Sequence, residues 1–418
     1  MVRGLSLRRP WPRLAGLTGS AGGLWRAPHL PLFLAASFWA GLVPLVWLAP
    51  GLVCDPVAWH RQELVLGVAG AAMGGYLLAA LPHWIGQGGR NRPGASTAPR
   101  VTRLLVLAWA IGRVVGGPCL PDMVALAGQS LYPLGLTAAL ALPVIGARAW
   151  GRLPMALAPL LMLLIAVRLR LAGDSLTAML GLALLVALVG GRIVPAFLRA
   201  RAGGDTTRRA SVPAMARLAD LALALALCAH LAGLGPRLTG SLLLVAALGQ
   251  ALRVAGWPLA AGLRGGQGDL AVLVLAWGWL PVGLALAGQS LVGQSLGFGI
   301  GPSLATALHA LAMGMMGSMV LAVMARAWMR RVPGALRLGA LLAAAFALVQ
   351  LATVLRLALP ANPVPAALCW SLGWALATAK AVAALFQPVP HPVLSARRLA
   401  LPSGSAADGQ AACTLPSR

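Results

Sequence analysis

The chain has 418 residues, of which 59% are hydrophobic and only 10% are charged, a balance far from that of soluble globular proteins. Apolar runs of about 20 residues, the length needed to cross a bilayer, recur from end to end. The composition excludes a soluble globular protein and indicates an all-α polytopic membrane protein. The formal net charge of +25 does not indicate a nucleic-acid partner, because the arginines gather in short loops between apolar runs.

Twelve transmembrane spans are predicted in chain order, with boundaries loose by about four residues. They are Leu30–Leu48, Gln62–Leu81, Arg103–Gly117, Met123–Ala147, Leu153–Leu171, Ser175–Leu198, Ala214–Leu234, Leu238–Trp257, Leu270–Gly288, Pro302–Ala325, Leu338–Leu359 and Val364–Phe386. These spans form one membrane domain over residues 30–387. A basic tail (1–29) precedes it, and a tail that we expect to be disordered (388–418) follows.

The arginines are concentrated in alternate loops. They lie before span one and after the even-numbered spans, whereas the intervening loops hold few: Arg61, Arg168, Arg170 and Arg237. The positive-inside rule therefore predicts that both termini are cytoplasmic.

The five cysteines form neither a CxxC pair nor a CxxCH motif, so we expect no structural zinc site and no covalent c-type haem. Cys54 and Cys119 both fall near the outer face, but we do not expect them to pair.

Two polar side chains open span two. His60 and Glu63 are three residues apart, and therefore on one helix face. Glycines at helical spacing continue that face and would admit a neighbouring helix or a flat cofactor: Gly67, Gly70 and Gly74. The imidazole could bind a metal or haem while the carboxylate orients the ring. The alternative is an interfacial cap begun by Asp55.

A third candidate ligand, His309, lies in span ten, and Met313 follows one turn later on the same face. Imidazole and thioether together suit copper or haem iron, although methionine also packs well in ordinary cores. Spans two and ten run in the same direction, so His60 and His309 lie in the same half of the membrane. One shared site and two separate sites are both compatible with the sequence.

Two arginines inside spans could bind a haem propionate: Arg113, late in span three, and Arg192, late in span six. Either could instead snorkel to the headgroups. We expect Asp220 to pair with Arg217 or Arg253. The tail histidines, His29 and His391, are expected to be solvated.

Several ordered motifs resemble those of the NnrS family. The residues that carry the resemblance are Trp59-His60 with Glu63 and Gly67, Gly190-Gly191-Arg192 with Ile193-Val194-Pro195, Trp279-Leu280-Pro281, and His309-Ala310-Leu311 with Gly314 and Gly317. The resemblance implies twelve spans, bound haem and copper, a bacterial inner-membrane location and a role in the response to nitric oxide. Turnover of nitric oxide and metal handling would both account for that role. Three positions at which the family pattern has histidine carry Gln62, Val274 and Arg331, so His60 and His309 remain as ligands.

We therefore expect a divergent NnrS-like membrane protein that binds haem b, or alternatively copper, through His60 and/or His309. Nitric oxide is the expected small-molecule ligand. A metal-free transporter or permease of a small solute is the alternative. A terminal oxidase is excluded, because it needs at least six ligating histidines and two of this chain's six lie in the tails.

The predicted orientation can be tested with a reporter enzyme. Alkaline phosphatase fused after Arg398 should be inactive, because it folds only outside the cytoplasm, whereas a fusion in the loop that holds Arg237 should be active. Activity after Arg398 would reverse the predicted topology.

Overall fold

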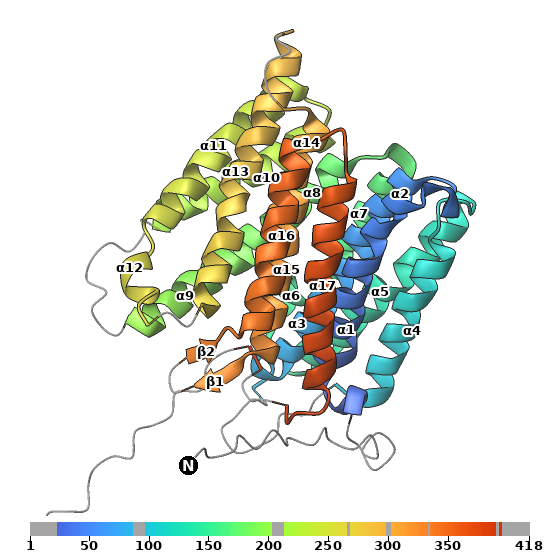
Figure 1. The fold of residues 1–418 in the computed structure, drawn as a ribbon, viewed down its shortest axis with the longest axis vertical. Coiled ribbons are helices and arrows are strands. Elements are labelled where there is room, and N and C mark those ends of the chain that lie inside the picture. The colour runs from blue at the N-terminus through green and yellow to red at the C-terminus, as the bar shows by residue number, and fades with distance from the viewer. Residues whose placement is uncertain are drawn as a thin grey trace, which may run out of the picture.

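The computed structural model describes residues 23–86, 97–202, 213–265, 268–297, 302–332, 335–389 and 393–394. Nearly all of them are helical (Figure 1). The helices are α1 (His29–Leu42), α2 (Pro56–Gln62), α3 (Gly70–Trp84), α4 (Pro99–Val115), α5 (Asp122–Gly146), α6 (Leu153–Ala156), α7 (Leu161–Ala172), α8 (Ser175–Leu185), α9 (Gly191–Ala202), α10 (Pro213–Leu231), α11 (Pro236–Ala255), α12 (Leu259–Gly262), α13 (Asp269–Ser295), α14 (Leu304–His309), α15 (Ser318–Trp328), α16 (Ala340–Ala358) and α17 (Val364–Ala384). Strands β1 (Arg330–Val332) and β2 (Ala335–Arg337) form an antiparallel hairpin in which Arg330 lies opposite Arg337.

Eleven helical segments of the described chain are long and apolar enough to cross a membrane. The other predicted span, span three, corresponds to α4, which has 17 residues and therefore a length of about 26 Å. It packs along α5, and the indole N–H of Trp109 donates to the Gly67 carbonyl at 2.9 Å. The predicted all-α membrane fold is confirmed. Span three is confirmed as a bundle helix, but it is shorter than the apolar core of a bilayer.

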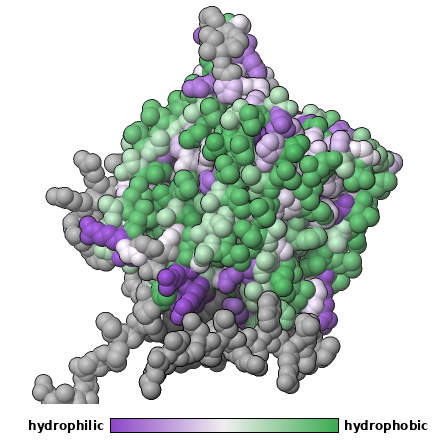
Figure 2. Space-filling model, in the orientation of Figure 1, coloured by the Kyte–Doolittle hydropathy of each residue, from purple (hydrophilic) through white to green (hydrophobic). Residues whose placement is uncertain are grey.

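The spans form a closed bundle. Neighbouring spans in the chain pack against one another, and α1 packs against α17. Apolar side chains cover the middle of the face shown in Figure 2, as expected for a surface in contact with lipid. Spans two (Pro56–Trp84) and ten (Leu304–Trp328) are the most enclosed, at 78% and 72% buried. The two candidate histidines therefore lie on the innermost helices.

Tight packing explains the glycines of span two. A Cβ at Gly67 would lie 2.9 Å from the Trp39 ring, and one at Gly74 would lie 2.0 Å from the Tyr132 hydroxyl. Aromatic side chains of neighbouring helices thus occupy the glycine face. The sequence allowed either a neighbour or a flat cofactor there, and the structure shows the neighbour.

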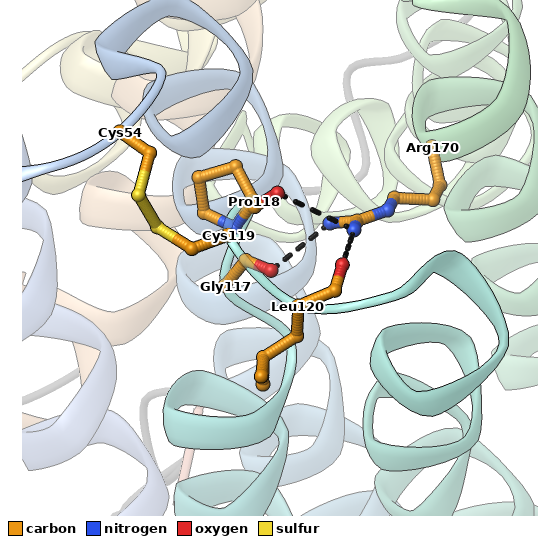
Figure 3. Close-up of a disulfide and its surroundings, with 6 residues drawn as sticks. All are labelled: Cys54, Gly117, Pro118, Cys119, Leu120 and Arg170. Atoms are coloured by element: carbon orange, nitrogen blue, oxygen red, sulfur yellow. Dashed lines mark hydrogen bonds between the residues drawn. A yellow bond between two sulfur atoms is a disulfide. The ribbon is translucent and has the colours of Figure 1, made fainter.

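Cys54 and Cys119 form a disulfide, contrary to expectation (Figure 3). It ties the segment before α2 to the loop between α4 and α5. Arg170 reinforces the same loop by donating to the carbonyls of Gly117 at 3.0 Å and of Leu120. Disulfides persist in oxidising compartments, which agrees with the predicted placement of this end outside the cytoplasm. The sequence placed both cysteines near the outer face, but it did not indicate that these two loops, 65 positions apart, are in contact.

The opposite end of the bundle is held by a buried carboxylate. Asp269 is inaccessible to solvent and accepts hydrogen bonds from Arg201 at 2.7 and 2.9 Å and from Arg326 at 3.3 Å. The Arg326 guanidinium also lies 4.4 Å from the centre of the Phe197 ring. Spans six, nine and ten are therefore joined by one charge cluster.

One tail residue differs from expectation. His29, expected to be solvated, begins α1, is only 2% exposed and packs against Phe33. A short helical turn, Gly23–Arg26, precedes it. After residue 387, the Leu394 carbonyl accepts a hydrogen bond from Arg326. His391 lies outside the described residues.

The disulfide predicts a chemical difference between the cysteines. Reduction should expose two further thiols to maleimide in the wild-type protein and none in the Cys54→Ser/Cys119→Ser variant. That variant should lose about 2–4 kcal/mol of stability, because it lacks the cross-link that restricts the unfolded chain of the wild-type protein. Cys228→Ser, at a free cysteine, is the control and should change neither the labelling difference nor the stability. Equal labelling before and after reduction would contradict the cross-link.

Removing the charge of Asp269 should destabilise the bundle strongly. Asp269→Asn leaves two guanidinium groups buried together without a counter-charge, at an expected cost of about 3–5 kcal/mol. Thermal unfolding in detergent measures the change. Asp122→Asn is the matched control, since its carboxylate also pairs with an arginine but is 54% exposed, so we expect a cost of about 0–1 kcal/mol. Equal losses of stability in the two variants would contradict the conclusion that Asp269 holds this end of the bundle together.

Candidate functional site

His60 stands in the last turn of α2, a helix with a well-marked start. The Asp55 carboxylate accepts from the Ala58 N–H at 2.9 Å, and Pro56 occupies the first turn. An aspartate cap followed by proline is a strong helix-initiating pair. The His60 ring packs edge-on against Trp47, with centroids 5.4 Å apart, and its Nδ1 is buried without a hydrogen-bond partner. Buried polar atoms are rarely left unpaired, so this nitrogen is a candidate ligand atom.

His309 ends α14, which Ser303 caps through the Thr306 N–H. Its Nδ1 lies 2.6 Å from the Ala305 carbonyl oxygen. A carbonyl only accepts, so Nδ1–H donates and the lone pair of the neutral ring resides on Nε2. Ligating histidines are commonly oriented by such a bond on the opposite nitrogen.

Both histidines line one cavity of about 430 Å³ at the disulfide end of the bundle, which we call the histidine cavity. The sequence left open whether they form one site or two, and the structure brings them together. Met313 lines the same cavity, as do two further methionines, Met316 and Met179. Most of the remaining wall is apolar.

Each histidine is followed by a π-helical turn. Glu63–Ala69 begins three residues after His60, and Ala310–Gly317 begins directly after His309. Such turns break the regular hydrogen-bond ladder and occur frequently at functional sites. A third, Val186–Gly190, lies in span six, directly before Gly191. Nothing in the apolar pattern distinguished the first two from ordinary helix.

Two arginines that were not predicted as site residues also line the histidine cavity: Arg61 and Arg356. Arg61 donates to the Gly173 carbonyl at 2.8 Å, and Arg356 donates to the Pro360 carbonyl at 2.9 Å. A guanidinium has five N–H donors, so each can donate to a further acceptor. Arg356 carried a usable signal, because it is an ionisable residue inside span eleven. Arg61 was counted as a loop charge.

Glu63 and Arg113 form a separate cluster. Glu63 Oε2 accepts from Arg113 at 2.9 Å and from the Trp39 indole at 2.6 Å, and both charged side chains are almost completely buried. Neither residue lines the histidine cavity. The structure therefore does not place the Glu63 carboxylate where it could orient the His60 ring. Arg113 already has a carboxylate partner within the protein, Glu63.

The other nominated positions also lie away from the histidine cavity. Gln62 is buried beside Gln129, whose amide donates to the Gln62 oxygen at 3.2 Å. The departure from histidine at Gln62 consequently removes no side chain from the cavity wall. Arg192 is exposed. Val274 is partly buried in the apolar core, and Arg331 donates to the Val393 carbonyl at the other end of the bundle.

A neighbouring hollow of about 580 Å³ adjoins the histidine cavity and shares Arg61 and Ser175 with it. Asp174 lines this hollow and lies 3.0 Å from His230 Nε2. Burial alone would raise the pKa of Asp174, but hydrogen bonds from His230, Thr177 and Arg168 outweigh it and hold the pKa below the usual range. Asp220, expected to pair with Arg217 or Arg253, pairs with Arg253 at 2.9 Å. Both carboxylates thus already have basic partners within the protein.

Within the described ranges, no group of three or more His, Cys, Asp or Glu side chains is placed to hold a metal ion. A metal in the histidine cavity would therefore take two imidazoles and a ligand of another type. Methionine sulfur or the ring of a macrocycle meets that requirement.

Comparison with known proteins agrees with the motifs. No curated protein matches the sequence. A family model described as "NnrS protein" matches residues 23–388, which include every described span and both cavity histidines. The chain belongs to the NnrS family.

Proposed function

We propose that the histidine cavity binds one metal cofactor, most simply a b-type haem, and that the protein acts in the bacterial inner membrane in the response to nitric oxide or nitrosative stress. One observation carries the proposal: His60 and His309, from the two most enclosed spans, line one apolar cavity. Ionisable residues inside membrane spans are costly and are usually retained for function.

The residues of the cavity fit a haem. His60 has a buried Nδ1 with no partner, and His309 has its Nε2 lone pair uncommitted, so either ring could hold the iron of a haem. The apolar wall suits a macrocycle. Arg61 and Arg356 supply donors for two carboxylates, and they take the place in this proposal that Arg113 and Arg192 held on sequence grounds.

Copper is the alternative metal for the same cavity. Two imidazoles with the thioether of Met313 form a soft donor set that suits copper. The volume of about 430 Å³ is in the range of a site for one small ligand or cofactor, so we propose one occupant and not both.

The chain's own residues would orient and shield the cofactor. Trp47 supports the His60 ring from its edge, and the Ala305 carbonyl fixes the tautomer of His309. The apolar wall excludes water and so strengthens electrostatic interactions inside. A bound haem would supply an iron atom at which a diatomic gas such as nitric oxide can coordinate. A hydrophilic solute would find few polar partners here, which favours a cofactor over the transporter alternative.

The cofactor part is tested by optical spectra and metal analysis of the purified protein. Wild type should show a Soret band and bound iron, whereas His60→Ala and His309→Ala should each lower haem content at least about tenfold. His83→Ala is the matched control, because His83 is an exposed histidine on the same span as His60. Copper without a Soret band would select the alternative metal. Wild-type protein with neither metal would contradict the proposal and favour a metal-free permease.

The physiological part needs a separate measurement. Cells that depend on this protein should lose tolerance to a nitric oxide donor with His60→Ala and keep it with His83→Ala. If the purified protein contains the cofactor but cells that lack the protein keep their tolerance, only the nitric oxide role is contradicted.

A further inference from the structure

A second cavity, of about 440 Å³, lies at the end of the bundle opposite the histidine cavity, where α1, α15, β1 and α17 meet. We call it the basic cavity. Its wall contains four basic side chains, Arg26, Arg330, Arg331 and Lys380, together with His29. Among the described residues that line it there is no Asp or Glu. Such a concentration of one sign of charge favours an anion.

The cations retain hydrogen-bonding capacity. The side chains of Arg330 and Lys380 make no hydrogen bond or ion pair with any described residue. Arg26 donates from one terminal nitrogen to the Ala384 carbonyl at 2.9 Å, while its Nε is buried without a partner. Burial lowers the pKa of Arg26, the direction expected when a cation is desolvated.

No described acidic side chain can neutralise this cavity, because all six are engaged elsewhere. Asp55 caps α2, and the other five pair with cations: Glu63 with Arg113, Asp122 with Arg170, Asp174 with Arg168 and His230, Asp220 with Arg253, and Asp269 with Arg201 and Arg326. The counter-charge must therefore come from outside the described residues.

The depth of the cavity indicates which anion is available. Its wall includes the first residue of span one, His29, the last of span ten, Trp328, and the last of span twelve, Ala384. Span ends lie at the level of the lipid headgroups. Buried apolar side chains, Leu30 and Met329, line the cavity beside the cations. Basic pockets at the ends of membrane helices on the cytoplasmic side suit phosphate headgroups. We propose that the basic cavity binds the phosphate of an anionic phospholipid.

The test uses the full-length protein in a neutral detergent, with phosphatidylglycerol binding followed by native mass spectrometry. Binding should be saturable, and phosphatidylcholine should not compete at equal concentration. Arg330→Gln/Lys380→Gln should weaken it roughly 25-fold, at about fivefold for each neutralised cation. Arg337→Gln is the matched control, because Arg337 lies opposite Arg330 in the hairpin but does not line the cavity. It should bind within about twofold of wild type.

Three results would overturn the proposal. Equal weakening by Arg337→Gln would indicate general surface attraction. Equally tight binding of inorganic phosphate, with the same dependence on Lys380, would assign the cavity to a free anion. Binding that appears only after residues 395–418 are removed would make the chain's own tail the occupant. Lys380→Arg keeps the charge and should keep the affinity, which separates loss of charge from loss of folding in the double variant.

Discussion

The shortage of acidic side chains is the constraint on which this structure depends. Buried cations in a membrane protein need counter-charges, and an uncompensated buried charge costs several kcal/mol. The chain has eight acidic residues against 33 basic ones, and the six in the described ranges are all committed. Asp269 joins three spans at one end of the bundle, and Glu63 joins spans one, two and three in the other half. These pairs neutralise the arginines that they include, whereas the charges of other basic side chains are not neutralised by a described acidic residue.

Two groups of basic side chains line cavities whose described walls contain no Asp or Glu. Arg61 and Arg356 lie beside the histidines, and the basic cavity occupies the opposite end. The two cavities differ in what accompanies the charge. The histidine cavity adds two imidazoles and several thioethers to an apolar wall, a donor set that would fit the proposed metal cofactor. The basic cavity lies at the ends of three spans and adds only a short apolar flank. One shortage of acids thus leaves two chemically different cavities.

The sequence predicted the helices well because the bilayer leaves little choice. Backbone groups without water must bond within a helix, so apolar runs of sufficient length, such as Asp269–Ser295, become spans. It predicted His60, His309 and Met313 as candidates because polar and soft side chains are conspicuous there. It did not predict which of them meet, since spans two and ten are distant in the chain. The Cys54–Cys119 disulfide and the Glu63–Arg113 pair were missed for the same reason. Arg356 was missed although its place inside a span was visible.

Glu63 shows how a correct helix face can still mislead. His60 and Glu63 are three residues apart, which on a regular helix directs them about 60° apart. The π-helical turn begins at Glu63, and the carboxylate reaches Trp39 and Arg113 on one side while His60 lines the cavity on the other. Glu63 is close to a candidate ligand in the chain, but its carboxylate joins helices of the bundle and does not face the histidine cavity. Because Glu63 is already paired with Arg113, the polar groups available to an occupant of the histidine cavity are its two imidazoles and its two arginines.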